Sequence, residues 1–229
     1  MVKVGVVDYG IGNVSSVIAA FDRIGVLCAA LENATEAQSF SHLVLPGVGA
    51  FGPAMKRLEQ LDWVSAITQY ANSGGALLGI CLGMQILATE SCESAPIDGT
   101  RSKRSFPGQI ATTTVESKQC TTSGLGLIPG VVQSLKSFGS EKRIPHMGWN
   151  SVHVEGGPAL FSGLPTELDM YFVHSYGLAT VSPLTIASTN YGCEFSAAIQ
   201  QENVMGTQFH PEKSSQYGLQ LLQNFVSLQ

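Results

Sequence analysis

The sequence predicts an α/β fold: an open, mostly parallel sheet with helices on both faces and added antiparallel strands. In the first half of the chain, short apolar runs alternate with stretches whose apolar residues recur every three or four positions. This pattern is typical of strands alternating with helices. In the second half, strand-like runs follow one another with turn residues between them, which is typical of antiparallel strands. The length of 229 residues suits one domain, and we predict a single domain over 1–229.

The first half begins with a Val-rich run, and the helix after it opens at Asn13, a residue type that caps helix N-termini. Val14, Val17 and Phe21 then give this helix an apolar face. The apolar runs are nearly continuous, so the sheet they form should be covered on both faces. We expect strands over 2–8, 26–31, 42–45 and 76–80, a helix over 63–71, and further helices beginning near residues 13, 53 and 84.

The second half carries the expected antiparallel additions on one side of the parallel core. A closing C-terminal helix is marked by Leu219, Leu222 and Phe225. The segment 94–123 is rich in Ser, Thr and Gly and is predicted to be a long inserted loop. The strands expected in this half are 131–136, 151–155, 169–174, 184–188, 195–200 and 204–209.

Composition excludes several classes of protein. Hydrophobic residues make up 44% of the chain and charged residues 13%, which excludes intrinsic disorder. The net charge of −5 argues against a nucleic-acid partner. No apolar run approaches the roughly 18–20 residues that cross a bilayer, and the N-terminal run is too short for a signal peptide. We therefore expect a cytoplasmic protein. The chain has five cysteines but no C-x-x-C pair, so we do not expect a thiolate metal site.

The sharpest local motif is GICLG at residues 79–83, between an expected buried strand and an expected helix. It is the cysteine version of the G-x-S-x-G nucleophile elbow, whose sharp turn pushes the central side chain out of the sheet. Cys81 would also lie at a helix N-terminus, where the thiolate is favoured over the thiol. Taken alone, the motif fits a buried structural cysteine equally well.

A cysteine nucleophile needs a base, and the base needs a residue that orients it. Among five histidines, His210 stands at the end of the expected strand 204–209. The carboxyl ends of parallel strands meet at one edge of a sheet, so His210 would lie near Cys81. Glu212 is two residues further on, and in an extended segment it would point to the same side. The alternative is a surface turn with an unrelated acid.

A third element is PGVG at residues 46–49, after the strand 42–45. Attack on a carboxamide creates an oxyanion that is stabilised by two N–H donors. Leu82, directly after the nucleophile, can provide one of them, and the glycine-rich loop can provide the other from Val48 or Gly49. For this loop taken alone, a plain turn is the simpler interpretation.

Together these motifs resemble the class I, triad-type glutamine amidotransferases. More specifically, the chain resembles the glutaminase subunits of imidazole glycerol phosphate synthase, from residue 2 to the C-terminal helix. Because the matching motifs occur in order along the whole chain, a chance resemblance is excluded. These motifs are 8–13 (DYGIGN), 46–49 (PGVG), 79–85 (GICLGMQ), 145–150 (PHMGWN), 171–176 (YFVHSY) and 208–213 (QFHPEK).

The resemblance implies that Cys81 is the nucleophile, that His210 is the general base and acid, and that Glu212 orients His210. A carboxylate at Glu93 would pair with the α-ammonium of glutamine, although the family often has two acids where this chain has Cys92-Glu93. The implied glutamine pocket comprises Gly47, Gln85, Glu93, His174, Ser175 and Tyr176. The implied docking face for a partner comprises Asn13, Trp149, Tyr171 and Lys213.

The function implied by the resemblance is hydrolysis of glutamine through a cysteine thioester, without metal or cofactor. The ammonia would pass to a cyclase subunit, a (β/α)₈ barrel bound as a heterodimer, for histidine biosynthesis. One alternative is a paralogous glutaminase that supplies ammonia for amidino-sugar synthesis. Two further alternatives are a non-catalytic binding subunit and a cysteine peptidase.

Overall fold

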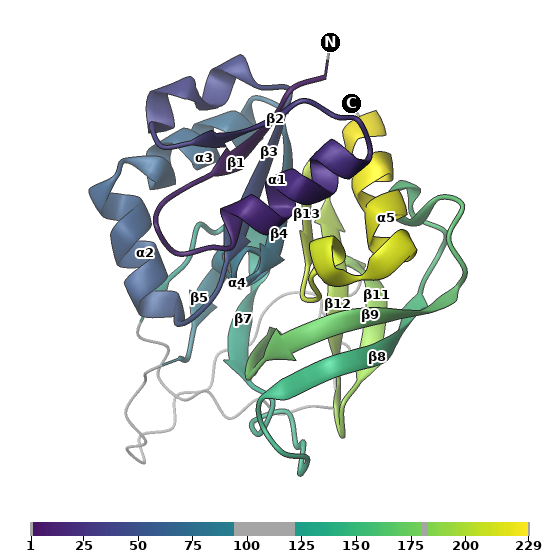
Figure 1. Ribbon diagram of the computed structural model, residues 1–229. Helices are drawn as coiled ribbons and strands as arrows, with labels where there is room; N and C mark the ends of the chain where they lie inside the picture. The colour runs from purple at the N-terminus through teal and green to yellow at the C-terminus, as the bar shows by residue number, and fades with distance from the viewer. Residues whose placement is uncertain (1, 94–121, 180–182, 229) are drawn as a thin grey trace.

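The computed structural model describes residues 2–93, 122–179 and 183–228, and its main feature is a nine-stranded sheet (Figure 1). The strand order is β2-β1-β3-β4-β13-β12-β11-β8-β9. The predicted fold class is confirmed. In the part of the chain described here, no helix is long and apolar enough to cross a membrane.

The first five strands in that order are parallel. Val6, Leu43 and Leu77 are fully buried, because helices cover both faces as the continuous apolar runs predicted. Helices α1 and α5 pack on one face and lie in front of the sheet in Figure 1, whereas α2 and α3 pack on the other. The parallel strands are β1 (Val4–Val7), β2 (Cys28–Leu31), β3 (His42–Gly47), β4 (Ala76–Cys81) and β13 (Val204–Thr207). The helices are α1 (Val14–Arg23), α2 (Phe51–Gln60), α3 (Trp63–Asn72), α4 (Leu82–Ile86) and α5 (Ser215–Ser227).

The remaining four strands of the large sheet extend it in antiparallel fashion beyond β13. They are β12 (Glu194–Gln201), β11 (Thr185–Asn190), β8 (His146–Val154) and β9 (Glu167–His174). The expected antiparallel addition on one side is therefore confirmed, but the expected strand 131–136 lies in a second sheet, where it pairs with a parallel strand. Strand β8 begins at residue 146 rather than 151, because the backbone of residues 146–150 pairs with β9.

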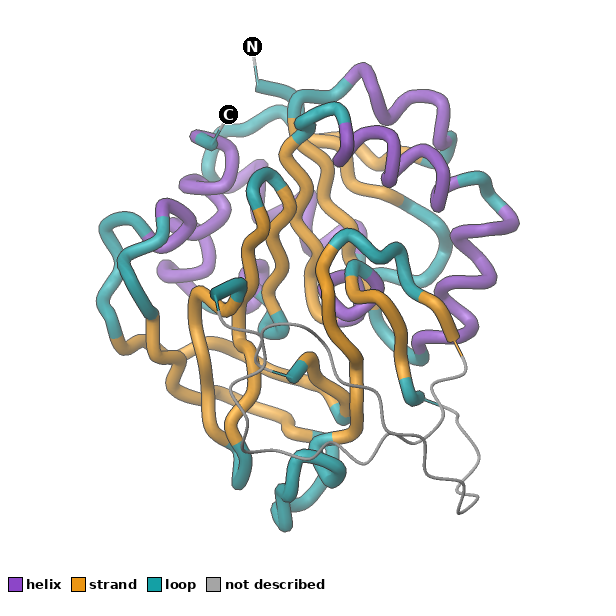
Figure 2. The backbone as a smooth tube through the Cα atoms, turned by 180° about the vertical axis from the view of Figure 1, so that it is seen from behind, coloured by secondary structure: helices purple, strands orange, loops and turns teal. Residues whose placement is uncertain are grey.

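A second sheet of four strands was not predicted, and its strand order is β10-β7-β5-β6. It consists of β10 (Tyr176–Leu178), β7 (Ile128–Ser134), β5 (Ala88–Ser91) and β6 (Thr122–Ser123). Figure 2 shows this side of the molecule, opposite to α1 and α5. The expected strand 131–136 corresponds to β7, whereas β5, β6 and β10 are short and no local pattern predicted them. The predicted loop 94–123 lies mostly outside the described residues, and its last two residues form β6.

Candidate active site

Cys81 occupies a sharp turn between β4 and α4. Its backbone has φ 56° and ψ −110°, a conformation that is rare for a residue with a side chain. The flanking glycines permit this turn. A Cβ atom on Gly83 would lie 1.7 Å from the carbonyl oxygen of Leu45, and one on Gly79 would lie 2.7 Å from the backbone of Gly83. The elbow interpretation of GICLG therefore has the geometry that the motif requires.

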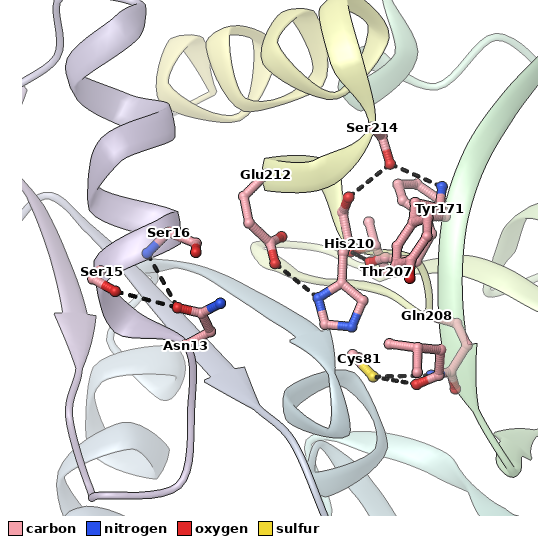
Figure 3. Close-up of polar contacts among 12 residues, drawn as sticks. Asn13, Ser15, Ser16, Cys81, Tyr171, Thr207, Gln208, His210, Glu212 and Ser214 are labelled. Atoms are coloured by element: carbon pink, nitrogen blue, oxygen red, sulfur yellow. Dashed lines mark hydrogen bonds and ion pairs between the residues drawn. The ribbon is translucent and has the colours of Figure 1, made fainter. Parts of the chain in front are cut away.

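His210 comes to Cys81 because β13 pairs with β4 in parallel, with Thr207 opposite Ile80. Its Nδ1 atom lies 2.8 Å from Oε1 of Glu212 (Figure 3), and both side chains are buried, with exposed fractions of 2% and 1%. The contact is the one predicted, but the predicted extended segment is wrong. Residues Pro211–Lys213 form a 3₁₀ turn, which brings the two side chains together by curvature.

Electrostatics in this triad favour a charged imidazole. Burial by itself lowers the pKa of His210, but interactions with the Cys81 thiolate and with the Glu212 carboxylate raise it to about 9. Nε2 of His210 has no hydrogen-bond partner among the described residues, while its ring edge faces the sulfur in Figure 3.

The backbone of His210 is held on strand β9. Its N–H donates to the carbonyl of Tyr171 over 2.9 Å, and its carbonyl accepts from the hydroxyl of Ser214 over 2.6 Å. The same hydroxyl accepts from the N–H of Tyr171 over 3.0 Å (Figure 3). Ser214 thereby fastens the segment that carries His210 to a strand of the antiparallel half.

A cavity of about 330 Å³ opens in front of Cys81. It brings together nine of the sequence-predicted site residues, and its lining comes from five separate segments of the chain. Gly47 of the predicted pocket does not line it. Its lining consists of Val48, Gly49, Cys81, Leu82, Gln85, Glu93, Pro145, Val173, His174, Ser175 and Tyr176.

Glu93 reaches this cavity with one carboxylate oxygen already engaged. Oε2 accepts a hydrogen bond from the backbone N–H of Phe51 over 2.6 Å. Burial raises the pKa of Glu93, and this hydrogen bond partly opposes the effect. The contact fixes the carboxylate at the start of α2, where it can meet an ammonium group in the cavity.

Two predicted pocket residues use their polar atoms within the protein. Nε2 of Gln85 donates to the carbonyl of Tyr176 over 2.8 Å and to Oε1 of Gln208 over 3.0 Å. Nδ1 of His174 bonds the same Tyr176 carbonyl over 2.8 Å. Burial lowers the pKa of His174 to about 3, so its ring is neutral. Gln85 and His174 therefore fix the backbone of the pocket wall.

The loop predicted to complete the oxyanion hole begins as β3 ends. Gly47 pairs with Cys81 across the sheet, and a Cβ atom on it would lie 2.8 Å from the Tyr9 hydroxyl. Val48 is 41% exposed, and Gly49 has a φ of 94°, which favours glycine. The loop thus lies beside Cys81 and has the conformational freedom that a movable N–H donor requires.

The expected docking residues are brought together only in part. Trp149 and Tyr171 pair across β8 and β9, with ring centroids 6.1 Å apart, and Nζ of Lys213 lies 6.0 Å from the Tyr171 ring. Trp149 is 55% exposed, and so is its strand neighbour Met147 at 62%. Asn13 instead caps α1, where its side chain accepts from the N–H of Ser16.

Sequence reasoning missed Gln208 and His146. Gln208 is fully buried, and its Nε2 donates to Sγ of Cys81 over 3.7 Å. His146 bonds His174 with its Nδ1 over 2.9 Å. The spacing of Gln208, two residues before His210, was an available signal for the first. Nothing local marked the second. The described residues contain no group of three or more His, Cys, Asp and Glu able to hold a metal.

Comparison with known proteins agrees with this geometry. The family model for glutamine amidotransferase class-I matches residues 5–228. The chain belongs to this family. Among solved structures of similar fold, PurLQS from Thermotoga maritima superposes with a TM-score of 0.70 at 17% identity, covering 99% of this chain and 98% of that one.

Two curated relatives of this chain carry the same name. Imidazole glycerol phosphate synthase subunit HisH from Desulfitobacterium hafniense (strain DSM 10664 / DCB-2) is 40% identical over 223 residues, which cover 97% of this chain and 92% of the relative. The protein of the same name from Methanosarcina barkeri is 40% identical over 230 residues, with full coverage of both chains. The resemblance inferred from the motifs is therefore confirmed.

Proposed function

We propose that this chain is the glutaminase subunit of an imidazole glycerol phosphate synthase in histidine biosynthesis. It hydrolyses glutamine to glutamate and ammonia. The observation that carries the proposal is the elbow cysteine, with the buried His210–Glu212 pair beside it, in a chain 40% identical to proteins named as subunits of that synthase. Membership of the class I amidotransferase family supports the same reaction.

In the proposed mechanism, the Cys81 thiolate attacks the side-chain carbonyl carbon of glutamine. The oxygen becomes an oxyanion that accepts hydrogen bonds from the N–H of Leu82 and from the N–H of Val48 or Gly49. The C–N bond then breaks, and protonated His210 gives its proton to the leaving ammonia. A glutamyl thioester remains on the sulfur.

Water completes the turnover. Neutral His210 takes a proton from water as the water attacks the thioester, and the second tetrahedral intermediate releases glutamate and the thiolate. The pKa of about 9 for His210 supports its role as the proton donor at neutral pH. Glu212 holds Nδ1, so that Nε2 is the atom that exchanges protons with sulfur, ammonia and water.

In the proposed pocket, Glu93 binds the α-ammonium of glutamine, because it is the acidic group among the residues that line the cavity. Ser175 and Tyr176 border the bound side chain. Gln85 and His174, which the cavity also exposes, hold the wall in place through the carbonyl of Tyr176. Gly47 contributes by its lack of a side chain, which leaves room for Tyr9 behind the oxyanion loop.

The proposed partner is a cyclase subunit with a (β/α)₈ barrel, bound as a heterodimer on the face that carries Trp149, Tyr171 and Lys213. The exposure of Trp149 and Met147 supports this face, because large apolar side chains are enriched in interface centres. Asn13 contributes to this docking face through the cap that it forms on α1. We also propose one domain over 1–229 and a cytoplasmic location, as the relatives' biosynthetic role favours.

The experiment that tests the function is a glutaminase assay with and without the cyclase subunit of the same organism. Glutamate release that rises on addition of the cyclase, and glutamine-dependent product formation by the pair, are expected. Glutamate release without any response to the cyclase would favour the amidino-sugar paralogue. No release in either condition would favour a non-catalytic subunit, and cleavage of peptides in place of glutamine would favour a peptidase.

A further inference from the structure

A buried glutamine contacts the reactive sulfur and has no part in the mechanism above. Nε2 of Gln208 donates to Sγ of Cys81 over 3.7 Å, and the side chain lies beside the sulfur in Figure 3. Its backbone N–H is bonded to the carbonyl of Ala197 over 2.8 Å, which fixes the residue on β12. Gln208 is fully buried, so no water molecule at the surface competes for this amide.

The orientation of the Gln208 amide follows from a backbone carbonyl. The oxygen of Tyr176 can only accept, so the atom of Gln85 that lies 2.8 Å away is its NH₂ nitrogen. That nitrogen can only donate, and it also lies 3.0 Å from Gln208, which must therefore present its oxygen there. The NH₂ group of Gln208 is left facing the sulfur. Turning either amide over would place two donors or two acceptors against each other.

Two neutral histidines hold the same carbonyl in place. Nδ1 of His174 carries a proton, because it lies 2.8 Å from the Tyr176 oxygen. Nε2 of His174 then accepts from Nδ1 of His146 over 2.9 Å. Burial lowers the pKa of His174 to about 3 and that of His146 to about 4, so neither ring carries a charge. The Tyr176 oxygen thus receives two fixed donors, and the direction of every bond from His146 to Cys81 is determined.

We propose that Gln208 is a further catalytic residue, whose amide N–H stabilises the thiolate of Cys81, and that Gln85 is the positioning residue that aims it. This inference rests on the proposed role of Cys81 as the nucleophile. A hydrogen bond given to the charged form of a group favours that form. The neutral thiol has a different partner, the carbonyl of Val173 at 3.8 Å, to which its S–H donates. Ionisation therefore loses the bond to Val173 and strengthens the bond from Gln208.

The test is the rate at which iodoacetamide alkylates Cys81 in the full chain as a function of pH, with the modified peptide identified by mass spectrometry. Gln208→Met removes the donor at similar length. Gln208→Glu keeps an oxygen toward Gln85 and places a carboxyl group at the sulfur. In both variants we expect alkylation at pH 7 to fall about ten-fold or more, because one hydrogen bond to a charged group is lost. The pH of half-maximal alkylation rises in parallel.

The matched control is Thr207→Val. Thr207 is also fully buried, and its hydroxyl donates to the carbonyl of Phe209 over 3.0 Å without contacting the sulfur. We expect this variant to keep the wild-type pH profile. Gln85→Met, which frees the Gln208 amide to turn, should slow alkylation by less than Gln208→Met does.

Unchanged alkylation of Cys81 in folded Gln208 variants would overturn the proposal, and so would an equal loss in Thr207→Val. Folding is checked by circular dichroism. If neither Gln208 variant folds, Gln85→Met decides, because wild-type alkylation in it would show that the amide does not act on the sulfur. Alkylation needs no glutamine. Glutaminase activity in Cys81→Ala would thus refute the role of Cys81 as the nucleophile. It would leave the alkylation rates of the Gln208 variants unchanged.

Discussion

The parallel and antiparallel halves of the large sheet make different contributions to this protein. The parallel strands β4 and β13 are buried on both faces and place Cys81 and His210 at adjacent carboxyl ends. Of the antiparallel strands, β9 forms part of the cavity wall and β8 exposes Trp149. The comparison teaches that the candidate catalytic residues are held by covered strands, whereas the proposed docking face lies on strands with one face free.

The two halves are also joined by hydrogen bonds at Tyr171. The N–H of His210 and the hydroxyl of Ser214 both bond to the backbone of Tyr171. Tyr171 also stacks edge-on against the exposed Trp149. A protein that covers Trp149 would therefore lie next to Tyr171, whose backbone is hydrogen-bonded to the segment that carries His210. The predictions below test whether the chemistry and the docking are separate functions of the two halves.

The largest expected effect comes from a substitution in the parallel half. Cys81→Ala should reduce kcat for glutamine hydrolysis by about six orders of magnitude, as the loss of a covalent nucleophile does in other triads. The measurement is glutamate release, with circular dichroism to verify folding. Cys193→Ala is the matched control, because Cys193 is a free cysteine whose thiol contacts the carbonyl of Leu135. Substantial turnover by folded Cys81→Ala protein would refute the assignment.

Glu212→Gln should lower kcat by about 10³–10⁴ with little change in KM, because Glu212 orients His210 and does not touch substrate. The same change should lower the pKa of His210 from about 9 by removing a carboxylate that favours the charged ring. A raised KM with unchanged kcat would contradict the orienting role.

The pH dependence of the protein's stability should also depend on His210. The folded-state pKa of His210 is raised from 6.5 to about 9, so its stabilising contribution is full below about pH 6.5 and is lost as the pH rises through about 9. Melting temperatures measured between pH 6 and pH 10 should therefore fall more steeply for the wild type than for Glu212→Gln. Parallel curves would show that the charged imidazole does not stabilise the fold.

A smaller effect on kcat is expected from the loop 46–49, which borders the cavity. The flanking glycines allow the peptide at Val48 to turn and bring an N–H toward the oxyanion. A partner that favours this state would raise kcat by about 10²–10³, the value of one oxyanion donor. Steady-state kinetics of the chain alone, with the cyclase, and with cyclase plus its nucleotide ligand test this. Equal kcat in all three conditions would exclude this effect of a partner on the loop.

The smallest effect is expected from a substitution in the antiparallel half. Trp149→Ala should weaken binding of the cyclase by about thirty-fold, the effect of removing an interface hot spot, while hydrolysis by the isolated chain stays unchanged. Binding is measured by isothermal titration. His153→Ala is the control, because His153 is exposed on the same strand but opposes Glu167 further from Trp149. Equal losses in the two variants would place the partner elsewhere.

Local sequence determined the chemistry of this protein. GICLG specifies the elbow because a side chain at Gly83 would collide with Leu45 of β3. The residues His210 and Glu212 are close in the chain, so their contact was predictable, although the 3₁₀ turn that makes it was not. The apolar runs likewise predicted the parallel strands, since burial on both faces leaves a continuous signal.

Tertiary structure decided everything that depends on partners distant in sequence. In the second sheet, β7 pairs with β5 and β10, and of these three strands only β7 has a strand pattern of its own. The orientation of the Gln208 amide is set by Gln85 and by the carbonyl of Tyr176, neither of which lies near it in the chain. A hydrogen bond between side chains depends on where the backbone brings them and on which of their atoms other groups have already engaged. Sequence determines the donors and acceptors, and only the fold determines which of them meet.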